Sequence, residues 1–153
     1  MGPLQPTVMV AAAHPQFQVV FDAADPHRVV AFWAAALGYE VEDHTAVVDG
    51  LVEAGQLPPQ AVIEFAGDHR GFADVAAASD PDSGRPRLFF QRVPESKTMK
   101  NRVHLDLHVG TGAIDDTVER LTGLGAVFAW ETLDRGPRNV TMHDPEGNEF
   151  CVS

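Results

Sequence analysis

The sequence has a single cysteine, Cys151, among its 153 residues. One cysteine excludes an internal disulfide and a zinc knuckle made of several cysteines, so a metal site must use mainly histidine, carboxylate or amide groups. A chain of this length buries roughly 70% of the surface that its extended form exposes, which is enough for a core without such cross-links. We therefore expect an ordinary globular domain.

Long apolar runs are also lacking. The longest one, residues 29–37, has 9 residues, far fewer than the roughly 20 that cross a bilayer. Residues 1–13 have no basic leading segment followed by a long apolar core, so they do not resemble a secretory signal. These features predict a cytoplasmic protein without a membrane partner, in which residues 1–15 form an N-terminal extension.

Basic residues are scarce. The chain has 11 Lys and Arg against 22 Asp and Glu, which gives a net charge of −11. Such a surface repels phosphate backbones and anionic headgroups, so nucleic acid is excluded as an expected partner. Most of the basic residues lie within residues 85–102, where they either attract an anionic ligand or only balance the acidic surface.

The chain contains an internal repeat. A strand pattern before Asp25 leads into an apolar helix stripe that ends at Gly38, and the same order returns from Arg102 to a helix that ends at Gly125. Gln18 in the first copy and His104 in the second lie about 86 residues apart. We predict an α+β fold of two βαβββ modules, with curved and mostly antiparallel sheets.

The module boundaries follow from the repeat. The first module spans 16–93, a polar connector spans 94–101, and the second module spans 102–153. Within the first module, residues 45–56 have apolar positions at helical spacing and predict a short inserted helix. Its later strands are predicted at 61–65, 72–77 and 87–93.

Polar and apolar residues alternate in residues 102–109, where Leu105 and Leu107 are interleaved with His104, Asp106 and His108. Alternate residues of a strand face opposite sides of a sheet. The polar side either meets solvent or encloses a ligand, and the mixture of His, Gln, Asp, Glu and Arg favours a ligand cup. The same alternation recurs in the strands that carry Gln18, Arg87, Phe89, Gln91 and Glu149.

Several short motifs, taken together in this order, resemble the vicinal oxygen chelate superfamily. They are Gln18 before Asp25, the pairs 32–33 and 37–38 in the first helix, His104, and the turn 144–148. The runs 88–95 and 100–106 are similar to glyoxalase-like domain proteins, of the glyoxalase, bleomycin-resistance and dioxygenase type. The resemblance covers residues 16–153.

That resemblance implies a cup over a small ligand, often with a divalent metal. The superfamily's usual ligand positions, occupied by His or Gln, Glu, His and Glu, fall here on Gln18, Gln91, His104 and Cys151. Two carboxylates are thus replaced, which disfavours Mg²⁺ or Mn²⁺ and leaves two readings open. Either a softer ion, Zn²⁺ or Ni²⁺, uses His104 with a Cys151 thiolate, or the cup is metal-free and Cys151 is a small buried hydrophobe.

The candidate catalytic residues are His104, Asp106 and Glu149. An imidazole titrates near neutrality and a carboxylate two residues away can orient it, although these groups are equally consistent with a polar network that fixes the strand. The turn 144–147 is expected to be only a tight turn. His143 beside it either lines the rim of the cup or is a surface residue, and the second interpretation is favoured. Trp33 and Trp130 are expected in the core or between modules. The candidate ligand-binding residues are Gln18, Arg87, Phe89, Gln91 and His108.

Three functions follow as hypotheses. The first is an enzyme of lyase, isomerase or dioxygenase type that acts on a small oxygenated molecule. The second is a metal-free protein that binds or sequesters a small molecule, as resistance proteins of this superfamily do. The third is a scaffold that only forms a homodimer. Each predicts a different result for ligand binding and for a change at His104.

Overall fold

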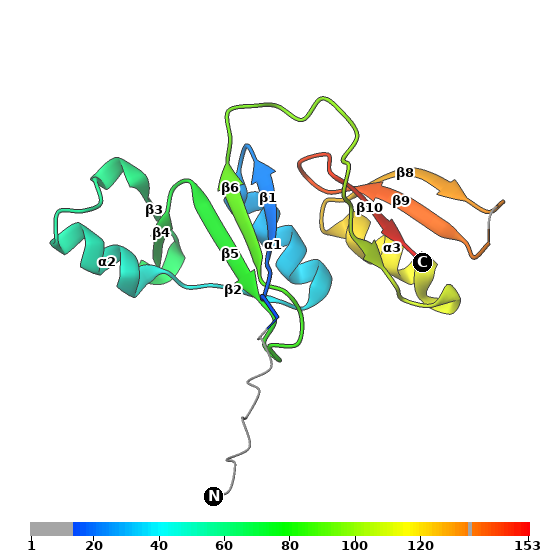
Figure 1. The fold of residues 1–153 in the computed structure, drawn as a ribbon, viewed down its shortest axis with the longest axis horizontal. Coiled ribbons are helices and arrows are strands. Elements are labelled where there is room, and N and C mark those ends of the chain that lie inside the picture. Colours follow the sequence, from blue (N-terminus) through cyan, green and yellow to red (C-terminus); the bar gives the residue numbers. More distant parts are fainter. Residues whose placement is uncertain (1–13, 135) are drawn as a thin grey trace, which may run out of the picture.

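Two sheets with the same strand order account for the repeat in the sequence (Figure 1). The computed structural model describes residues 14–134 and 136–153, so most of the predicted extension 1–15 lies outside the described residues. In each sheet the first strand runs parallel to the last, and the other neighbours are antiparallel. The structure is therefore an α+β fold with open, curved sheets.

The first sheet has the order β1-β6-β5-β2. It is formed by β1 (Val19–Ala23), β2 (Glu40–Val41), β5 (Val75–Ser79) and β6 (Leu88–Arg92), with α1 (Pro26–Leu37) between the first two strands. The second sheet has the order β7-β10-β9-β8. It is formed by β7 (Asp106–Leu107), β8 (Val127–Thr132), β9 (Asn139–His143) and β10 (Glu149–Val152), with α3 (Ile114–Gly123) after β7.

The inserted segment is larger than the predicted helix. That helix corresponds to α2 (Thr45–Glu53), but the insertion continues through β3 (Val62–Glu64) and β4 (Arg70–Phe72), which pair only with each other. The prediction that residues 61–65 form a strand of the module sheet is therefore wrong. Strand alternation identifies a strand but not its partner, and here the partner is the adjacent hairpin strand.

The predicted strand 102–109 is also shorter than expected. Only Asp106 and Leu107 are in β7, although the hydrogen-bonded backbone extends further, because Cys151 N donates to Leu105 O and Val109 N donates to Ser153 O. Residues 101–104 have no strand partner in the structure, so they follow an irregular path. As a result, His104 lies just before the strand.

Helix α1 joins the two modules. The Asp25 side chain accepts hydrogen bonds from His27 N and Arg28 N at its start, and Gly38 ends it with a φ of 67°, a left-handed conformation that glycine adopts readily. The Trp33 ring lies 5.5 Å from that of Phe21 in the first module and 5.1 Å from that of Phe150 in the second. Trp33 therefore anchors the module interface, as expected.

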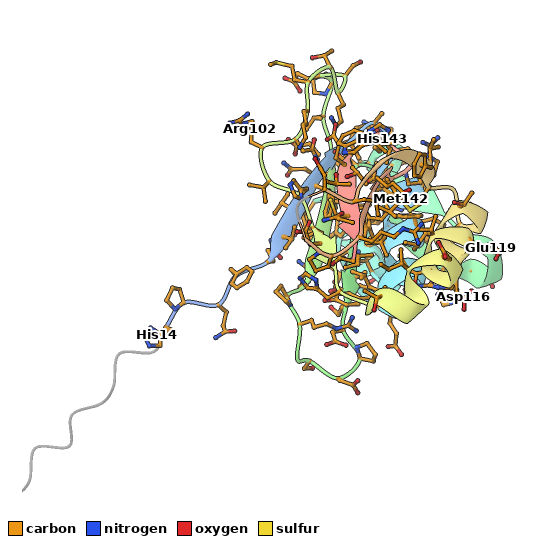
Figure 2. All side chains as sticks on the ribbon, turned by 90° about the vertical axis from the view of Figure 1, so that its right-hand side faces the viewer. His14, Arg102, Asp116, Glu119, Met142 and His143 are labelled. Carbon is orange, nitrogen blue, oxygen red and sulfur yellow. The ribbon has the colours of Figure 1, made fainter. Side chains whose placement is uncertain are left out.

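Helices α1 and α3 lie on one side of the two sheets, which places the polar residues on the other. Figure 2 shows α3 on one side of β10 and the loop that carries Arg102 on the other. The buried side chains of both modules form one core cluster on the helix side, against which Leu105, Leu107 and Val109 pack. The opposite side is the polar face predicted by the alternation. None of the helices in the described residues is both long and apolar enough to cross a membrane.

Candidate functional site

The pairing of β7 with β10 places Cys151 beside Asp106. The two strands are parallel, and Cys151 and Asp106 are partners in their register. Because side chains of register partners point to the same face of a sheet, both belong to the polar face with His104, two residues before Asp106. Residues that are distant in the sequence are thus brought together by one strand pair.

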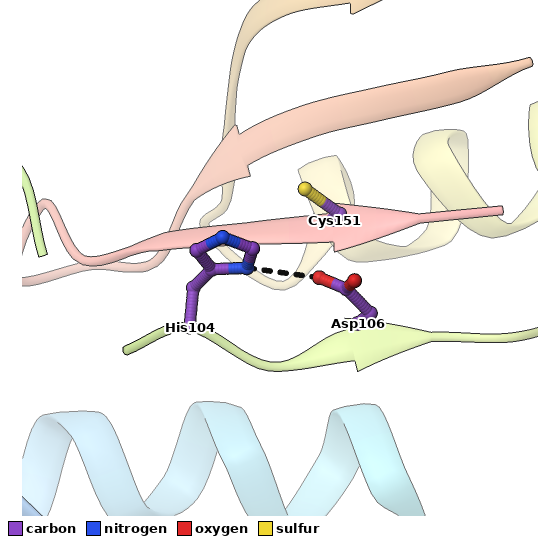
Figure 3. Close-up of side chains that lie close together, drawn as sticks. All are labelled: His104, Asp106 and Cys151. Carbon is purple, nitrogen blue, oxygen red and sulfur yellow. Dashed lines mark hydrogen bonds and ion pairs between the residues drawn. The ribbon is translucent and has the colours of Figure 1, made fainter. Parts of the chain in front are cut away.

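His104, Asp106 and Cys151 form a compact group (Figure 3). The Nδ1 atom of His104 lies 2.9 Å from Oδ1 of Asp106, and one potential metal-ligand atom from each of the three residues lies within 4.8 Å of the others. An ionised carboxylate only accepts hydrogen bonds, so Nδ1 of His104 donates and Nε2 keeps its lone pair in the neutral ring. The arrangement offers an oriented imidazole next to a carboxylate and a thiol.

The Cys151 thiol is held in its neutral form. Burial raises the pKa of Cys151, and this effect outweighs that of a contact with the Thr141 hydroxyl at 3.5 Å, which lowers it. A metal ion would have to displace the thiol proton. The thiol is therefore a ligand only when a metal supplies the charge that stabilises the thiolate.

The donor set fits a soft divalent cation. Asp106 adds an anionic oxygen that the predicted set of Gln18, Gln91, His104 and Cys151 lacked, and Zn²⁺ accepts nitrogen, oxygen and sulfur ligands together. Three protein donors leave a coordination position for a substrate, as in catalytic zinc sites. In the described part of the chain, no other group of His, Cys, Asp and Glu brings its ligand atoms together in this way.

Gln18 and Gln91 have partners in the first module. The Gln91 amide donates to Asp22 Oδ1 at 2.8 Å, and Gln18 Oε1 accepts from Arg87 at 2.9 Å. The amides are thus held in place by neighbouring side chains. Their assignment as metal ligands or ligand-binding residues stays a prediction.

Arg87 has its charge offset by Glu42. Its Nε and Nη2 atoms donate to the two carboxylate oxygens of Glu42 at 2.6 and 2.7 Å, and its guanidinium lies 5.3 Å from the centre of the Phe89 ring. Mainly because of the hydrogen bond from Arg87, the pKa of Glu42 is lowered to about 2. An anionic ligand would therefore have to compete with Glu42 for this guanidinium.

Glu149 ties the connector to the second sheet. Its carboxylate accepts from the Asn101 backbone N–H at 2.9 Å and pairs with Lys97 at 3.2 Å. Burial alone would raise the pKa of Glu149, but these hydrogen bonds prevail and lower it to about 2. The ionised Glu149 carboxylate, bonded to Asn101 and Lys97, holds residues 97–101 against the second sheet. The catalytic role predicted for Glu149 stays a prediction.

A crevice of about 260 Å³ opens beside His104. Its walls include Asp22 of β1, Val103 of the irregular segment 101–104 and Glu149 of β10, and also the core side chains Trp33 and Leu105. The crevice thus lies where the first strand of one module meets the segment that leads into the first strand of the other. His108 faces the polar side further along and contacts Ser153 Oγ at 2.9 Å, so it does not line this crevice.

Sequence reasoning missed Trp130 on this face and favoured a surface position over the cup rim for His143. The expectation that Trp130 lies in the core or between modules is wrong, because it belongs to the edge strand β8 and is 44% exposed. It pairs with Thr141, which itself pairs with Cys151, so all three share the polar face. The His143 ring lies 6.4 Å from that of Trp130. The alternation of Asn139, Thr141 and His143 was the available signal.

Comparison with known families agrees with this geometry. The family model described as a glyoxalase-like domain matches residues 18–153. The chain belongs to the glyoxalase-like domain family. This membership confirms the resemblance inferred from the sequence motifs and places the protein in the vicinal oxygen chelate superfamily. Among curated proteins, the comparison finds no match.

Solved structures share the fold of this glyoxalase-like domain protein. A glyoxalase/dioxygenase from Nostoc punctiforme is 19% identical, with a TM-score of 0.55 over 99% of this chain and 95% of that one. A glyoxalase/bleomycin resistance protein/dioxygenase family enzyme from Burkholderia phytofirmans is 16% identical, with a TM-score of 0.57 over 88% and 94%.

A third similar structure contains a metal. It is a mutant of the fosfomycin resistance protein FosX from Listeria monocytogenes, complexed with Mn(II) and 1S,2S-dihydroxypropylphosphonic acid. It is 12% identical, with a TM-score of 0.54 over 88% of this chain and 85% of that one. At these identities the likeness establishes the fold alone.

Proposed function

We propose that this glyoxalase-like domain protein is an enzyme that binds a small oxygen-bearing molecule on its polar face and moves a proton with His104. The observation that carries the proposal is the His104–Asp106 pair at 2.9 Å. His104 lines a crevice, and potential ligand atoms of the pair lie within 4.8 Å of that of Cys151. An oriented imidazole with an adjacent carboxylate is an effective proton-transfer group at neutral pH.

Asp106 does two things for His104. By accepting the Nδ1 proton it fixes the ring so that the lone pair of Nε2 is the one available to a substrate. When Nε2 takes up a proton, the carboxylate stabilises the resulting imidazolium. His104 therefore holds the proton, and Asp106 positions it.

As an alternative to proton transfer by His104, the residues His104, Asp106 and Cys151 would hold one divalent cation, Zn²⁺ or Ni²⁺. The Nε2 lone pair of His104 would then be a metal ligand and could not take up a proton. Such an ion, when bound, polarises a carbonyl or hydroxyl oxygen of the substrate. The thiol distinguishes this donor set from one made only of hard oxygen and nitrogen ligands, so Mn²⁺ and Mg²⁺ should bind less well. The three residues bind and orient the substrate, and the crevice beside His104 limits the size of the substrate.

Metal content is the direct test. The protein should be purified without a His-tag or chelating resin, incubated with Zn²⁺ and Ni²⁺, freed of excess ion and measured by inductively coupled plasma mass spectrometry. We expect near one ion per chain, with loss in His104→Ala and Cys151→Ser. His108→Ala, a change on the same strand face outside the donor group, should retain the metal. If folded wild-type protein holds no Zn²⁺ or Ni²⁺ after this treatment, the proposed metal site is wrong.

A metal-free binding or sequestering protein is the second candidate. Two observations favour it: the Gln18 and Gln91 amides already have hydrogen-bond partners, and burial keeps Cys151 protonated. In that case Zn²⁺ gives no thermal shift, while members of a library of small hydroxy and carbonyl compounds do. The shift should disappear in His104→Ala, and no turnover of the bound compound should be found.

A further inference from the structure

A second cavity, separate from the His104 crevice, lies between α1 and the inserted segment 45–72. Its volume is about 510 Å³, and none of its lining residues borders the His104 crevice. Cavities of roughly 300–1,000 Å³ accommodate small organic molecules. We call it the insertion pocket, lined by parts of α1, the end of β2, residues 42–44, residues 65–66 and 69–71, and the start of β5.

The walls of the insertion pocket are largely apolar. Val30 of α1, Val41 at the end of β2 and Phe65 of the insertion contribute hydrocarbon surface. Val41 and Phe65 are both exposed, which is unusual for large apolar side chains unless a partner covers them. The apolar body of a ligand would bury this surface.

Three histidines line the pocket, and each makes a hydrogen bond through one of its two ring nitrogens. His27 Nε2 lies 2.8 Å from the Phe72 carbonyl, His44 Nε2 lies 3.1 Å from the Glu42 carboxylate, and His69 Nδ1 lies 3.0 Å from the Asp43 carboxylate. Because these partners only accept, each of these ring nitrogens donates. In the neutral ring the other nitrogen is then a hydrogen-bond acceptor.

The charged groups of the pocket favour a cation over an anion. Asp43 provides a carboxylate whose oxygens accept from Thr45 and His69 and keep further lone pairs. The guanidinium of Arg70 is paired with Asp49 at 2.8 Å, and that of Arg87 nearby is paired with Glu42. The pocket therefore offers acceptors and negative charge but no uncommitted guanidinium among its described residues. The acidic surface of the whole chain, with a net charge of −11, also attracts cations and repels anions.

A metal ion is not the occupant that this geometry favours. The ligand atoms of His27, His44 and His69 do not converge as those of the His104 group do, and no metal-binding group is found in this part of the described chain. Separated acceptors around an apolar cavity instead suit an organic molecule with a donor group. The Phe65 ring, 5.1 Å from that of His27, adds an aromatic face that attracts cations.

We propose that the insertion pocket binds a small apolar amine in its protonated form. The hydrocarbon part lies against Val30, Val41 and Phe65, and the ammonium group donates to the Asp43 carboxylate. This is a ligand site in addition to the His104 site, and it is independent of the function proposed for that site.

Three probes of the same size test the charge requirement: benzylamine, benzyl alcohol and benzoate. Binding is followed by calorimetry and by backbone amide shifts in NMR spectra of the full chain. We expect saturable benzylamine binding with shifts at residues 65–71 and not at 104–107, at least tenfold weaker binding of benzyl alcohol, and none of benzoate. Equal binding of benzylamine and benzoate, or shifts confined to 104–107, would overturn the proposal.

Two variants test whether benzylamine binds in the insertion pocket. Asp43→Asn removes the carboxylate and should weaken benzylamine at least tenfold, and Ala31→Trp should block the cavity from the exposed side of α1. Asp68→Asn is the matched control: it removes a charge from the neighbouring inserted segment outside the pocket, at a φ of 61° that asparagine tolerates. The proposal fails if Asp43→Asn binds like wild type, or if Asp68→Asn loses as much affinity as Asp43→Asn.

Discussion

The Trp33 indole N–H donates a hydrogen bond of 2.9 Å to Oδ2 of Asp144, and both residues are buried. Trp33 lies on α1 of the first module and Asp144 lies in the turn between β9 and β10 of the second. The same turn reaches back through Glu146, whose Oε1 accepts from the backbone N–H groups of Ala24 and Asp25. The tight turn predicted at 144–147 thus also connects the two modules through hydrogen bonds.

Trp33→Phe should destabilise the fold by about 1–3 kcal/mol, because a buried Asp144 carboxylate loses a hydrogen-bond donor and the core loses volume. The free energy of unfolding in urea measures the effect. Trp130→Phe is the matched control, since Trp130 is half-exposed and should change stability little. Similar losses in the two variants would mean that the Trp33–Asp144 contact adds nothing beyond the ring itself.

Asp106→Asn should weaken Zn²⁺ binding about 10- to 100-fold, because an amide neither carries the charge nor orients His104 as the carboxylate does. Competition with a chromophoric chelator measures the affinity. Asp116→Asn, an exposed change on α3, removes the same charge at a distance and should leave the affinity unchanged. Affinity in Asp106→Asn equal to that of wild type would remove Asp106 from the site.

Acid should weaken the fold partly through Glu149. Its pKa is lowered from 4.5 to about 2 in the folded protein, so its contribution to stability is complete above pH 4.5 and is lost as the pH falls towards 2. We expect Glu149→Gln to be less stable at pH 7 and to lose less stability between pH 5 and 2 than wild type. Unfolding in urea at several pH values measures this.

Glu119→Gln, an exposed change on α3, is the control for Glu149 and should keep the acid dependence of wild type. Glu42, whose pKa is also lowered to about 2, contributes to the acid dependence of stability in both variants. The acid dependence of Glu149→Gln is therefore reduced and not abolished. A pH profile of Glu149→Gln that parallels wild type would show that the connector is not held by this carboxylate.

Arg87 and Glu42 should couple energetically. Removing either partner leaves the other charge half-buried, so Arg87→Ala and Glu42→Gln should each destabilise the fold, and the double variant should lose less than their sum. A double-mutant cycle in urea should give a coupling of about 1 kcal/mol. Strict additivity would instead indicate that the guanidinium is available to an anionic ligand.

Much of the fold could be predicted from the sequence because it depends on local periodicity. The helix stripe between Asp25 and Gly38 and the alternation around His104 are properties of neighbouring residues, and they are preserved in α1 and on the polar face. The exposure of His104, Asp106 and His108 opposite the packed Leu105 and Leu107 follows directly from a repeat of two residues along a strand.

Pairing between distant segments decided the rest. Local sequence patterns were enough to predict the two modules and the face on which His104 and Asp106 lie. Only the tertiary structure placed Cys151 beside Asp106, paired Arg87 with Glu42 and gave β3 its partner in β4. The physical reason is that alternation specifies the face of a strand and not its neighbour, whereas register and partner depend on how the whole chain packs.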